Sequence, residues 1–545
     1  MATNWTKAVR DRLTKTIPAD HLLPDKQPTY VRSSMYLLGA LTLATLVIIV
    51  VSGIVLAIFG PQWWHTNGVG RFMNSLHFWS VQGFFFFMVL HLWGMFFQGA
   101  WRDGRGRTWV VGGITFLVSI LAGFTGFLSQ SNFDSQWIGV SAKDLMNAVG
   151  VGGFFNPLNF GQMYSFHVIV LPLAVVGLVG LHLFMVRMRG VVRPYPVAGE
   201  QRVAYHKGMT QDQYYKNVPM APYDLIREVT IVTLVALVVV VALASVFSSP
   251  DEKPLTVQSV AQTSPVEFTT VSLAELAGTS VVAAYGPPYN TSIGAAQYLG
   301  PISLQRAAGV SIPIDTAQTY VLQPLGTVKN PEVVAALTTF NAAKADQQTT
   351  WETNYLTALG NNSTEAVDAN GHVTTASCTN TAGDKADCGP LPTLFGGLLD
   401  IARSGALDGL LLSNNGQFYQ TDYTKPLLFL NENALPSKAA TLNLSGADWG
   451  IMNETGKYPG QPWLWLYTFW YQVPVGPFNG PNADVGVAVM ILLLSLIFVF
   501  VPYIPGLNRV PEFIGIHRLI WRQHYREAQA AVARPTPTTV TNAQE

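Results

Sequence analysis

The stretch of sequence that decides the fold runs from His77 to Phe97 and reads HFWSVQGFFFFMVLHLWGMFF. About 20 apolar residues are enough for a helix to cross a bilayer, and this stretch has that length. A second stretch, Tyr164–Val186, reads YSFHVIVLPLAVVGLVGLHLFMV and has it too. Each contains two histidines, and ionisable residues inside a membrane are costly and usually functional. The two stretches therefore predict membrane helices that carry a functional site.

Four further windows are equally long and apolar: Met35–Phe59, Thr108–Leu128, Leu225–Phe247 and Val485–Pro502. They account for a composition of 49% hydrophobic and 12% charged residues, which argues against an ordinary soluble enzyme. The first window starts too far from the N-terminus for a cleaved signal peptide, and no small-residue cleavage site follows it. The sequence predicts an all-α integral membrane protein with six transmembrane helices.

Basic residues occur at alternate ends of these windows. They cluster before the first, between the second and third, after the fourth and after the sixth, as in Lys7, Arg102, Arg107, Arg189 and Arg518. The connections 60–76 and 131–163 have almost none. Because cytoplasmic loops are enriched in Lys and Arg, we expect a multi-pass plasma-membrane protein with both termini cytoplasmic. We expect no nucleic-acid partner.

The histidines form two matched pairs. His77 and His91 are 14 positions apart, and His167 and His182 are 15 apart. Helical geometry separates each pair by roughly 21–22 Å along about the same helix face. Both helices run from outside to inside, so we expect His77 level with His167 and His91 level with His182. Two facing imidazoles at each level suit two stacked six-coordinate haems, because imidazole is a good axial ligand of haem iron. Buried histidines bonded to neighbouring helices are the alternative.

Glycines repeat the histidine spacing. Gly39 and Gly53 lie 14 apart in the first window, and Gly112 and Gly126 lie 14 apart in the third. A flat macrocycle at each level would need a missing side chain at these positions. Small residues also serve plain helix packing in membranes.

The sequence resembles the cytochrome b family of quinol–cytochrome c and quinol–plastocyanin reductases, particularly the chloroplast type with fused subunit IV-like helices. The resemblance covers about 30–250 and 460–515. Its motifs are Ser75-Leu-His77-Phe-Trp-Ser80, Arg105-Gly-Arg-Thr-Trp-Val-Val-Gly112, Gly123-Phe-Thr-Gly126, Tyr164-Ser-Phe-His167 and His182-Leu-Phe-Met-Val-Arg187.

The resemblance implies two non-covalent haems b, with His77 and His167 holding the outer one and His91 and His182 the inner one. It also implies that Arg105 and Arg187 pair with inner-haem propionates, although both are also ordinary positive-inside residues.

At the inner face, the segment Ala221-Pro-Tyr-Asp224-Leu-Ile resembles the start of the family's fifth helix. Asp224, with His206, would then supply protons to a quinone there. Both could equally be ordinary polar residues of the linker.

The resemblance fails at the outer quinol site. The family places a carboxylate in a Pro-Glu-Trp-Tyr motif, where this chain reads Pro462-Trp463-Leu464-Trp465. A general base there needs a titratable group. Glu267 and Asp134 are the substitutes nearby, although Glu267 also fits a solvated surface position. The companion Leu-Pro-Trp-Asp pattern reads Leu128-Ser-Gln-Ser.

Other family positions differ as well. Arginines expected around the outer haem read Asn74, Phe78 and Gln162. Leu37 replaces the cysteine that anchors an extra haem in the chloroplast branch, so we expect two haems and not three.

A large insertion separates the last two windows. Residues 249–482 hold nine Lys and Arg against eighteen Asp and Glu and are rich in Thr, Ser, Asn and Gly, which predicts a soluble external domain. Within it, Val333–Leu359 and Thr393–Ala402 have helical apolar spacing. Both cysteines of the chain, Cys378 and Cys388, fall in it and predict a disulfide, with two free thiols as the alternative.

The predicted organisation has seven parts: an inner-face arm (1–34), a dihaem four-helix domain (35–190), an inner linker (191–224), a fifth membrane helix (225–248), the external domain (249–482), a sixth membrane helix (483–505) and a cytoplasmic tail (506–545). Residues 142–149 are expected to form a surface helix in the outer loop.

Three functions remain open. The first is a dihaem subunit that carries electrons across the membrane in a respiratory quinol-oxidising complex, with iron–sulfur or cytochrome c-type partner subunits and a possible homodimeric assembly. The second is a dihaem anchor that links another external oxidoreductase to the quinone pool without an outer quinol site. The third is a haem-bearing scaffold whose external domain organises an assembly.

Overall fold

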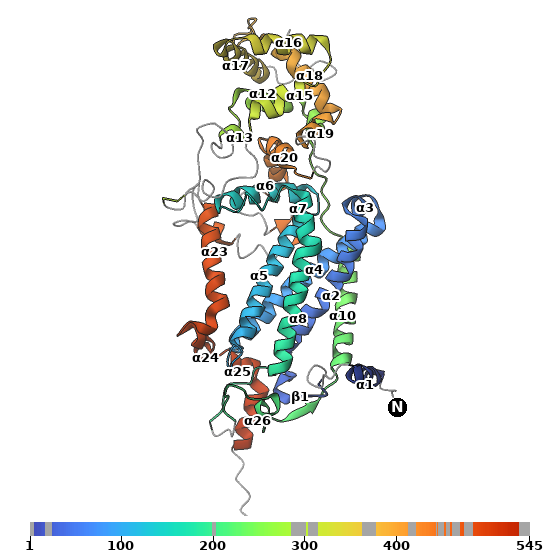
Figure 1. Ribbon diagram of the computed structural model, residues 1–545, viewed down its shortest axis with the longest axis vertical. Helices are drawn as coiled ribbons and strands as arrows, with labels where there is room; N and C mark the ends of the chain where they lie inside the picture. The colour runs from blue at the N-terminus through green and yellow to red at the C-terminus, as the bar shows by residue number, and fades with distance from the viewer. Residues whose placement is uncertain are drawn as a thin grey trace, which may run out of the picture. The chain divides into compact units, whose positions relative to one another are not determined.

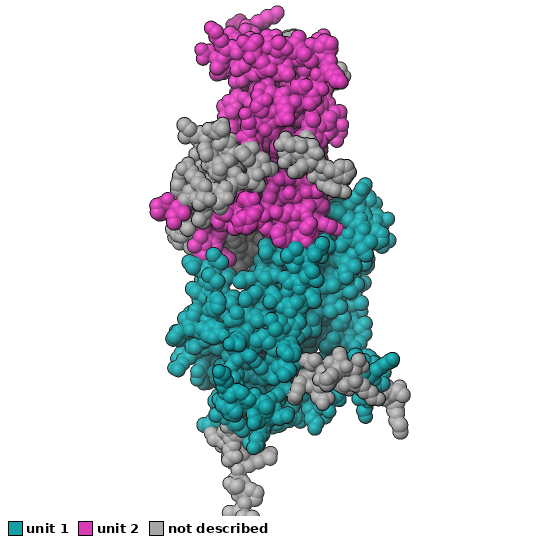
Figure 2. Space-filling model, viewed as in Figure 1, with its two compact units in different colours: residues 1–123, 168–249, 492–545 teal, residues 124–167, 250–491 magenta. Residues whose placement is uncertain are grey.

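The computed structural model describes residues 5–16, 24–198, 203–284, 301–302, 314–361, 378–412, 421–442, 444, 452–453, 458–459, 469–473 and 483–532. The chain forms two compact units, which Figure 2 colours separately. Unit 1 comprises Met1–Gly123, Val168–Ser249 and Leu492–Glu545, and unit 2 comprises Phe124–His167 and Pro250–Ile491. Each unit has hydrophobic clusters of its own.

The prediction of an all-α membrane protein with six candidate spans is confirmed. Six helices in the described residues are long and apolar enough to cross a membrane: Ser34–Phe59, Gly68–Phe97, Gly106–Leu128, Phe160–Arg189, Leu225–Phe247 and Val485–Tyr503. In Figure 1 they carry the labels α2 (Leu37–Phe59), α4 (Gly68–Phe97), α5 (Gly106–Leu128), α8 (Leu171–Arg189), α10 (Leu225–Phe247) and α23 (Ala483–Phe500).

The second span starts earlier than its apolar window. The Asn67 side chain accepts hydrogen bonds from the backbone amides of Val69 and Gly70 and so caps α4. Such a cap satisfies amides at a helix start that have no partner within the helix. The less apolar residues before His77 therefore belong to the helix. Within unit 1, α4 packs against α2 and α10.

The remaining elements of unit 1 lie at the helix ends. They are α1 (Trp5–Thr16), β1 (Lys26–Pro28), η1 (Thr29–Arg32), η2 (Ser34–Tyr36), α3 (Pro61–Thr66), α9 (Gln211–Tyr214), β2 (Met220–Pro222), η10 (Val501–Tyr503), η11 (Leu507–Arg509), α24 (Val510–Ile514), α25 (His517–Ile520) and α26 (Arg522–Val532). Strands β1 and β2 pair antiparallel, which ties the N-terminal arm to the segment before α10.

Unit 2 is also mainly helical. Its elements are α6 (Phe133–Ala148), α7 (Phe160–Ser165), η3 (Phe166–Val170), α11 (Val257–Thr263), α12 (Pro265–Ala277), α13 (Val281–Ala284), η4 (Gln318–Leu322), α15 (Gln323–Leu325), α16 (Pro331–Ala342), α17 (Ala345–Asn361), α18 (Leu391–Arg403), α19 (Ala406–Leu412), α20 (Thr424–Asn431), α21 (Ala434–Thr441), β3 (Met452–Asn453), β4 (Tyr458–Pro459) and η8 (Phe469–Gln472). Cys378 and Cys388 are joined by a disulfide.

One helix of the insertion 249–482 was predicted wrongly. The expected helix Val333–Leu359 is divided into α16 and α17. Ala343 adopts extended backbone angles at the break, and the Gln348 side-chain amide donates to the Phe340 carbonyl over 2.7 Å. The apolar spacing is helical on both sides, so the periodicity carries no sign of the interruption. The expected helix Thr393–Ala402 is confirmed as α18, and residues 142–148 form the second half of α6.

Candidate functional site

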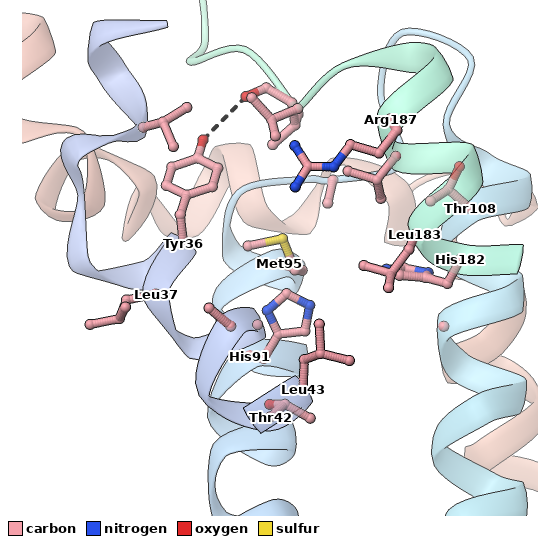
Figure 3. A pocket seen from close by; sticks show the side chains of 18 of the residues that line it. Tyr36, Leu37, Thr42, Leu43, His91, Met95, Thr108, His182, Leu183 and Arg187 are labelled. Atoms are coloured by element: carbon pink, nitrogen blue, oxygen red, sulfur yellow. Dashed lines mark hydrogen bonds between the residues drawn. The ribbon is translucent and has the colours of Figure 1, made fainter. Parts of the chain in front are cut away.

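The predicted inner histidine pair lines one cavity of unit 1. The cavity has a volume of about 600 Å³, and His91 enters its lining from α4 and His182 from α8 (Figure 3). Gly39 and Gly112 line it as well. Two helices thus present imidazoles to a space in which the sequence predicts a haem.

Each inner imidazole has a buried nitrogen without a hydrogen-bond partner among the described residues: Nδ1 of His91 and Nδ1 of His182. A buried polar atom left without a partner is destabilising. The His182 ring nevertheless has a hydrogen bond to the backbone of Thr108 on α5, and Nδ1 of each ring lies near the glycine opposite it, Gly39 or Gly112.

Each predicted glycine lies against one of the four imidazoles. A Cβ atom at Gly39 would lie 3.1 Å from Cε1 of His91, and one at Gly112 would lie 3.3 Å from Cε1 of His182. Gly53 faces His77 with a corresponding distance of 3.1 Å, and Gly126 faces His167. The missing side chains make room for the rings themselves. The shared 14-residue spacing thus reflects one glycine for each histidine.

Arg105 lies on the inner cavity but is already bonded. It is buried, and it donates to the carbonyl oxygens of Arg189 over 2.6 Å and Gly190 over 3.3 Å. Its guanidinium also lies 4.3 Å from the centre of the Tyr214 ring. Arg105 therefore fastens the end of α8 to the loop before α5. A propionate would have to share this guanidinium with those carbonyls.

The inner cavity is strongly basic. Its lining includes Lys26, Arg32, Arg105, Arg187 and Arg189, against the single carboxylate of Glu228. Haem propionates are anionic, so this charge balance fits the group that the sequence predicts.

Arg187 belongs to a second polar group of the cavity, together with Tyr223 and Glu228. Burial, and next the Glu228 carboxylate, raises the pKa of Tyr223 to about 12, while the Arg187 guanidinium opposes that rise. Sequence reasoning missed Tyr223 and Glu228. The available signal was an acidic residue in the first turn of an otherwise apolar helix, α10.

The residues predicted to serve an inner quinone lie outside the lining of this cavity. His206 is exposed, and its Nδ1 lies 3.4 Å from the Lys207 carbonyl oxygen. Asp224 caps α10 by accepting from the Arg227 amide, and it accepts from the Thr6 hydroxyl over 2.6 Å. The Thr6 hydrogen bond, followed by the Arg227 amide, lowers the pKa of Asp224.

Asp224 nevertheless lies next to the cavity. It lines a neighbouring pocket of about 490 Å³ together with Asp25, Tyr223 and Glu228. Tyr223 and Glu228 line both hollows. Glu228 therefore stands between Asp224 and the inner cavity.

His77 and His167, the predicted outer pair, fall in different units. In unit 1, Nδ1 of His77 lies 3.0 Å from the Ser52 hydroxyl oxygen, and Ser52 also bonds to the Ile48 carbonyl. Ser52 was not recognised from the sequence, where a serine one residue before Gly53 gave no signal of its own. The contact fixes the orientation of the His77 ring.

In unit 2, His167 lies in a π-helical turn, Phe166–Val170. Such a turn accommodates one extra residue in an α-helix and is frequent at functional sites. It explains why His167 and His182 are 15 positions apart when His77 and His91, on the regular helix α4, are 14 apart.

The predicted outer carboxylates lie in unit 2. Glu267 is half-buried in the first turn of α12 and accepts a hydrogen bond from Asn433 over 2.8 Å. Asp134 is buried in the first turn of α6, with 2% of its surface exposed. The segment 462–465, which replaces the family's glutamate motif, lies outside the described residues.

Comparison with known proteins finds similarity to cytochrome b proteins. A family model described as Cytochrome b(N-terminal)/b6/petB matches residues 82–254. Cytochrome b6 of Heliobacterium modesticaldum is 28% identical over 189 residues, which span 31% of this chain and 89% of that protein. The menaquinol:cytochrome c reductase cytochrome b subunit of Geobacillus thermodenitrificans is 28% identical over 203 residues, spanning 32% of this chain and 90% of that protein.

A solved structure, Hyperthermophilic respiratory Complex III, covers 76% of this chain and 99% of its own at 14% identity, with a TM-score of 0.32. That likeness is too low to support an argument. The family match, by contrast, includes His91, His167 and His182. Over these residues the chain is similar to cytochrome b6 and to the cytochrome b subunit of a menaquinol:cytochrome c reductase.

Proposed function

We propose that the chain is the dihaem cytochrome b subunit of a respiratory, bc-type quinol-oxidising complex. The observation that carries the proposal is the inner cavity, which His91 and His182 line from two different helices together with basic side chains. The names of the relatives, cytochrome b6 and a menaquinol:cytochrome c reductase subunit, support the same assignment.

The chain would hold two non-covalent haems b. His91 and His182 would ligate the inner iron, and His77 and His167 the outer iron. The haems supply reversible one-electron oxidation and reduction. The protein's contribution is to orient the imidazoles, with a glycine against each ring and Ser52 on His77, and to offset propionate charge with the basic lining that includes Arg105 and Arg187.

An inner quinone would bind beside Arg187, Tyr223 and Glu228. Quinone reduction consumes protons, and Glu228 is the carboxyl group in the cavity lining. Because Glu228 also lines the pocket that contains Asp224, a proton can pass from Asp224 to Glu228 and then to a quinone oxygen. Asp224 thus keeps the proton-supplying role expected from the sequence, one step further from the quinone. His206 is exposed and outside both linings, so we assign it no role.

The complex would lie in the plasma membrane, with both termini cytoplasmic and the insertion external. Iron–sulfur or cytochrome c-type subunits would take the electron that does not cross the membrane, and two copies of the complex would form a homodimer. Charge moved across the bilayer would couple the chemistry to the membrane potential.

A second candidate is a dihaem anchor without an outer quinol site. It is favoured by the binding of Glu267 to Asn433 within the external domain, because a carboxylate engaged there is a poor substitute for the missing glutamate. Under this reading, an external oxidoreductase delivers electrons and the inner site exchanges them with the quinone pool.

Haem content tests the proposal. Extraction of the purified protein should yield two non-covalent protohaems per chain, and His91→Ala should remove the inner haem spectrum while His206→Ala keeps both. A chain with one haem, or an unchanged inner spectrum in His91→Ala, would refute the ligand assignment. Inhibitors of outer quinol oxidation then separate the two candidates, since they should block only a complex that binds quinol outside.

A further inference from the structure

The C-terminal segment of unit 1 packs behind the inner cavity. Trp521, between α25 and α26, has 1% of its surface exposed and forms a buried cluster with Tyr30 of η1 and Val192. Val192 and its neighbour Val191 line the inner cavity, and so does Tyr36. A segment near the end of the chain therefore touches the wall of a site built from its first 230 residues.

A chain of hydrogen bonds connects Trp521 to this wall. The indole Nε1 of Trp521 donates to the Tyr36 hydroxyl oxygen over 3.1 Å, and that hydroxyl donates to the Val192 carbonyl oxygen over 3.2 Å. Figure 3 shows Tyr36 at the edge of the cavity, with a hydrogen bond drawn from its hydroxyl. Tyr36 thus bridges the start of α2 and the segment after α8, and Trp521 fixes the hydroxyl that makes the bridge.

Tyr525, four residues further along, binds Tyr195, which follows the lining residues Val191 and Val192. Its hydroxyl oxygen accepts from the Tyr195 amide over 3.1 Å and lies 3.0 Å from Nδ1 of His517. The His517 and Tyr195 rings have centroids 4.2 Å apart. The Arg102 guanidinium carbon lies 3.6 Å from the centroid of the Tyr195 ring.

We propose that the segment His517–Tyr525 is a positioning element of the inner quinone site. Trp521, through Tyr36, and Tyr525, through Tyr195, hold residues 191–195 at the distance from α2 that the ligand requires. This inference rests on the proposed function, because it takes a quinone to be the ligand of the cavity. It adds that affinity for that quinone is set from outside the cytochrome b core, by a segment beyond the matched residues 82–254.

The test measures reoxidation of the reduced inner haem in the purified complex. A short-chain benzoquinone and a short-chain naphthoquinone are the probes, and the rate at increasing concentration gives a half-saturating concentration and a maximum rate. Trp521→Phe removes the Nε1 donor and keeps an aromatic ring. We expect the half-saturating concentration to rise three- to tenfold, with the maximum rate within twofold of wild type and haem content unchanged.

Trp101→Phe is the matched control. Trp101 is also buried, and its Nε1 also donates one hydrogen bond, here to the Asn508 backbone carbonyl, but it is outside the cavity lining. It should leave the half-saturating concentration unchanged. Tyr36→Phe should raise that concentration as Trp521→Phe does, and the double variant should add nothing, because both substitutions break the same chain of bonds.

Equal half-saturating concentrations in wild type and Trp521→Phe would overturn the inference. If Trp521→Phe does not assemble, Tyr525→Phe replaces it, since loss of one hydroxyl leaves the packing intact, and the same threefold rise is required. A wild-type complex whose inner haem is not reoxidised by either quinone would refute the proposed function instead, and the two failures are thereby distinguished.

Discussion

The glycines opposite the inner histidines offer a sharp prediction about haem affinity. In Gly39→Ala the new Cβ would lie 3.1 Å from Cε1 of His91, which is closer than ordinary van der Waals contact. The imidazole would have to move by a few tenths of an ångström, away from the position in which it would ligate iron under the proposed function. Overpacking of this kind costs about 1–3 kcal/mol.

If that cost falls on the ligated state, haem affinity should drop by roughly 5- to 150-fold, because each 1.4 kcal/mol is about a factor of ten. Gly112→Ala, with its Cβ at 3.3 Å from His182, should have a smaller effect in the same direction. Gly180→Ala on α8 is the control, since a Cβ there would meet nothing within 4 Å. Gly180→Ala has the same gain in helix propensity as the other two variants, but its Cβ does not approach an imidazole.

The assay follows the inner haem spectrum of the purified protein during dilution or heating in detergent. We expect Gly39→Ala to lose the inner haem first, Gly112→Ala next, and Gly180→Ala to behave as wild type. The outer haem should stay in place in all three, because its glycines are Gly53 and Gly126. Equal retention by Gly39→Ala and Gly180→Ala would refute the reasoning.

Three further predictions concern single carboxyl groups. Burial raises the pKa of Glu275 to about 8, so the folded state holds its proton and stability is lost as pH rises from about 4.5 towards 8. Glu275→Gln should flatten the fall in melting temperature between about pH 4.5 and 8, as followed by scanning fluorimetry. Glu228→Gln should slow quinone reduction about 100-fold, with haem content unchanged, in stopped-flow assays. Asp422→Ala should destabilise unit 2 by about 1–3 kcal/mol and Asp422→Asn by less, because the side-chain amide of Asn156 loses one of its two acceptor residues and keeps Thr424; urea unfolding monitored by fluorescence measures both.

Much of the membrane region could be predicted because the bilayer restricts the choices. An apolar window of sufficient length has to be a helix there. An ionisable side chain within it is costly and therefore indicates a function. The same logic gave the glycines at 39, 53, 112 and 126, although the reason expected for them, contact with a macrocycle, differs from the contact with imidazoles that the structure shows.

The parts that could not be predicted depend on contacts between distant segments. Glu228 reads as an ordinary helix-start carboxylate until α10 and α8 place it near Arg187 in one cavity. Nothing in the sequence indicates that Trp521 donates a hydrogen bond to Tyr36, 485 positions earlier. The π-helical turn at His167 leaves only an odd spacing, 15 where its counterpart has 14, and that number alone does not say where the extra residue sits.

The insertion forms hydrogen bonds with residues of the segment 131–163, so the two depend on each other for their structure. Within unit 2, the backbone amide of Phe160 donates to Thr421 over 2.8 Å, and that of Tyr423 donates to Leu158 over 2.9 Å. Next to these bonds, the Lys143 ammonium donates to the Asn156 side chain, which in turn donates to Asp422 and Thr424.

Burial lowers the pKa of Lys143 to about 8, although the carboxylates of Asp422 and Asp144 oppose that shift. Residues 156–162 and 421–424 therefore share one polar core. Deletion of 270–455 would leave Asn156 without its partners in 421–424, and each unpaired buried group costs about 1–3 kcal/mol. Loss of activity in this deletion variant would then have two explanations, misfolding of the segment 131–163 or loss of the scaffold function. Substitutions in α16 or α17, away from residues 421–424, change the insertion without touching that core. They are the variants that distinguish misfolding from loss of the scaffold function.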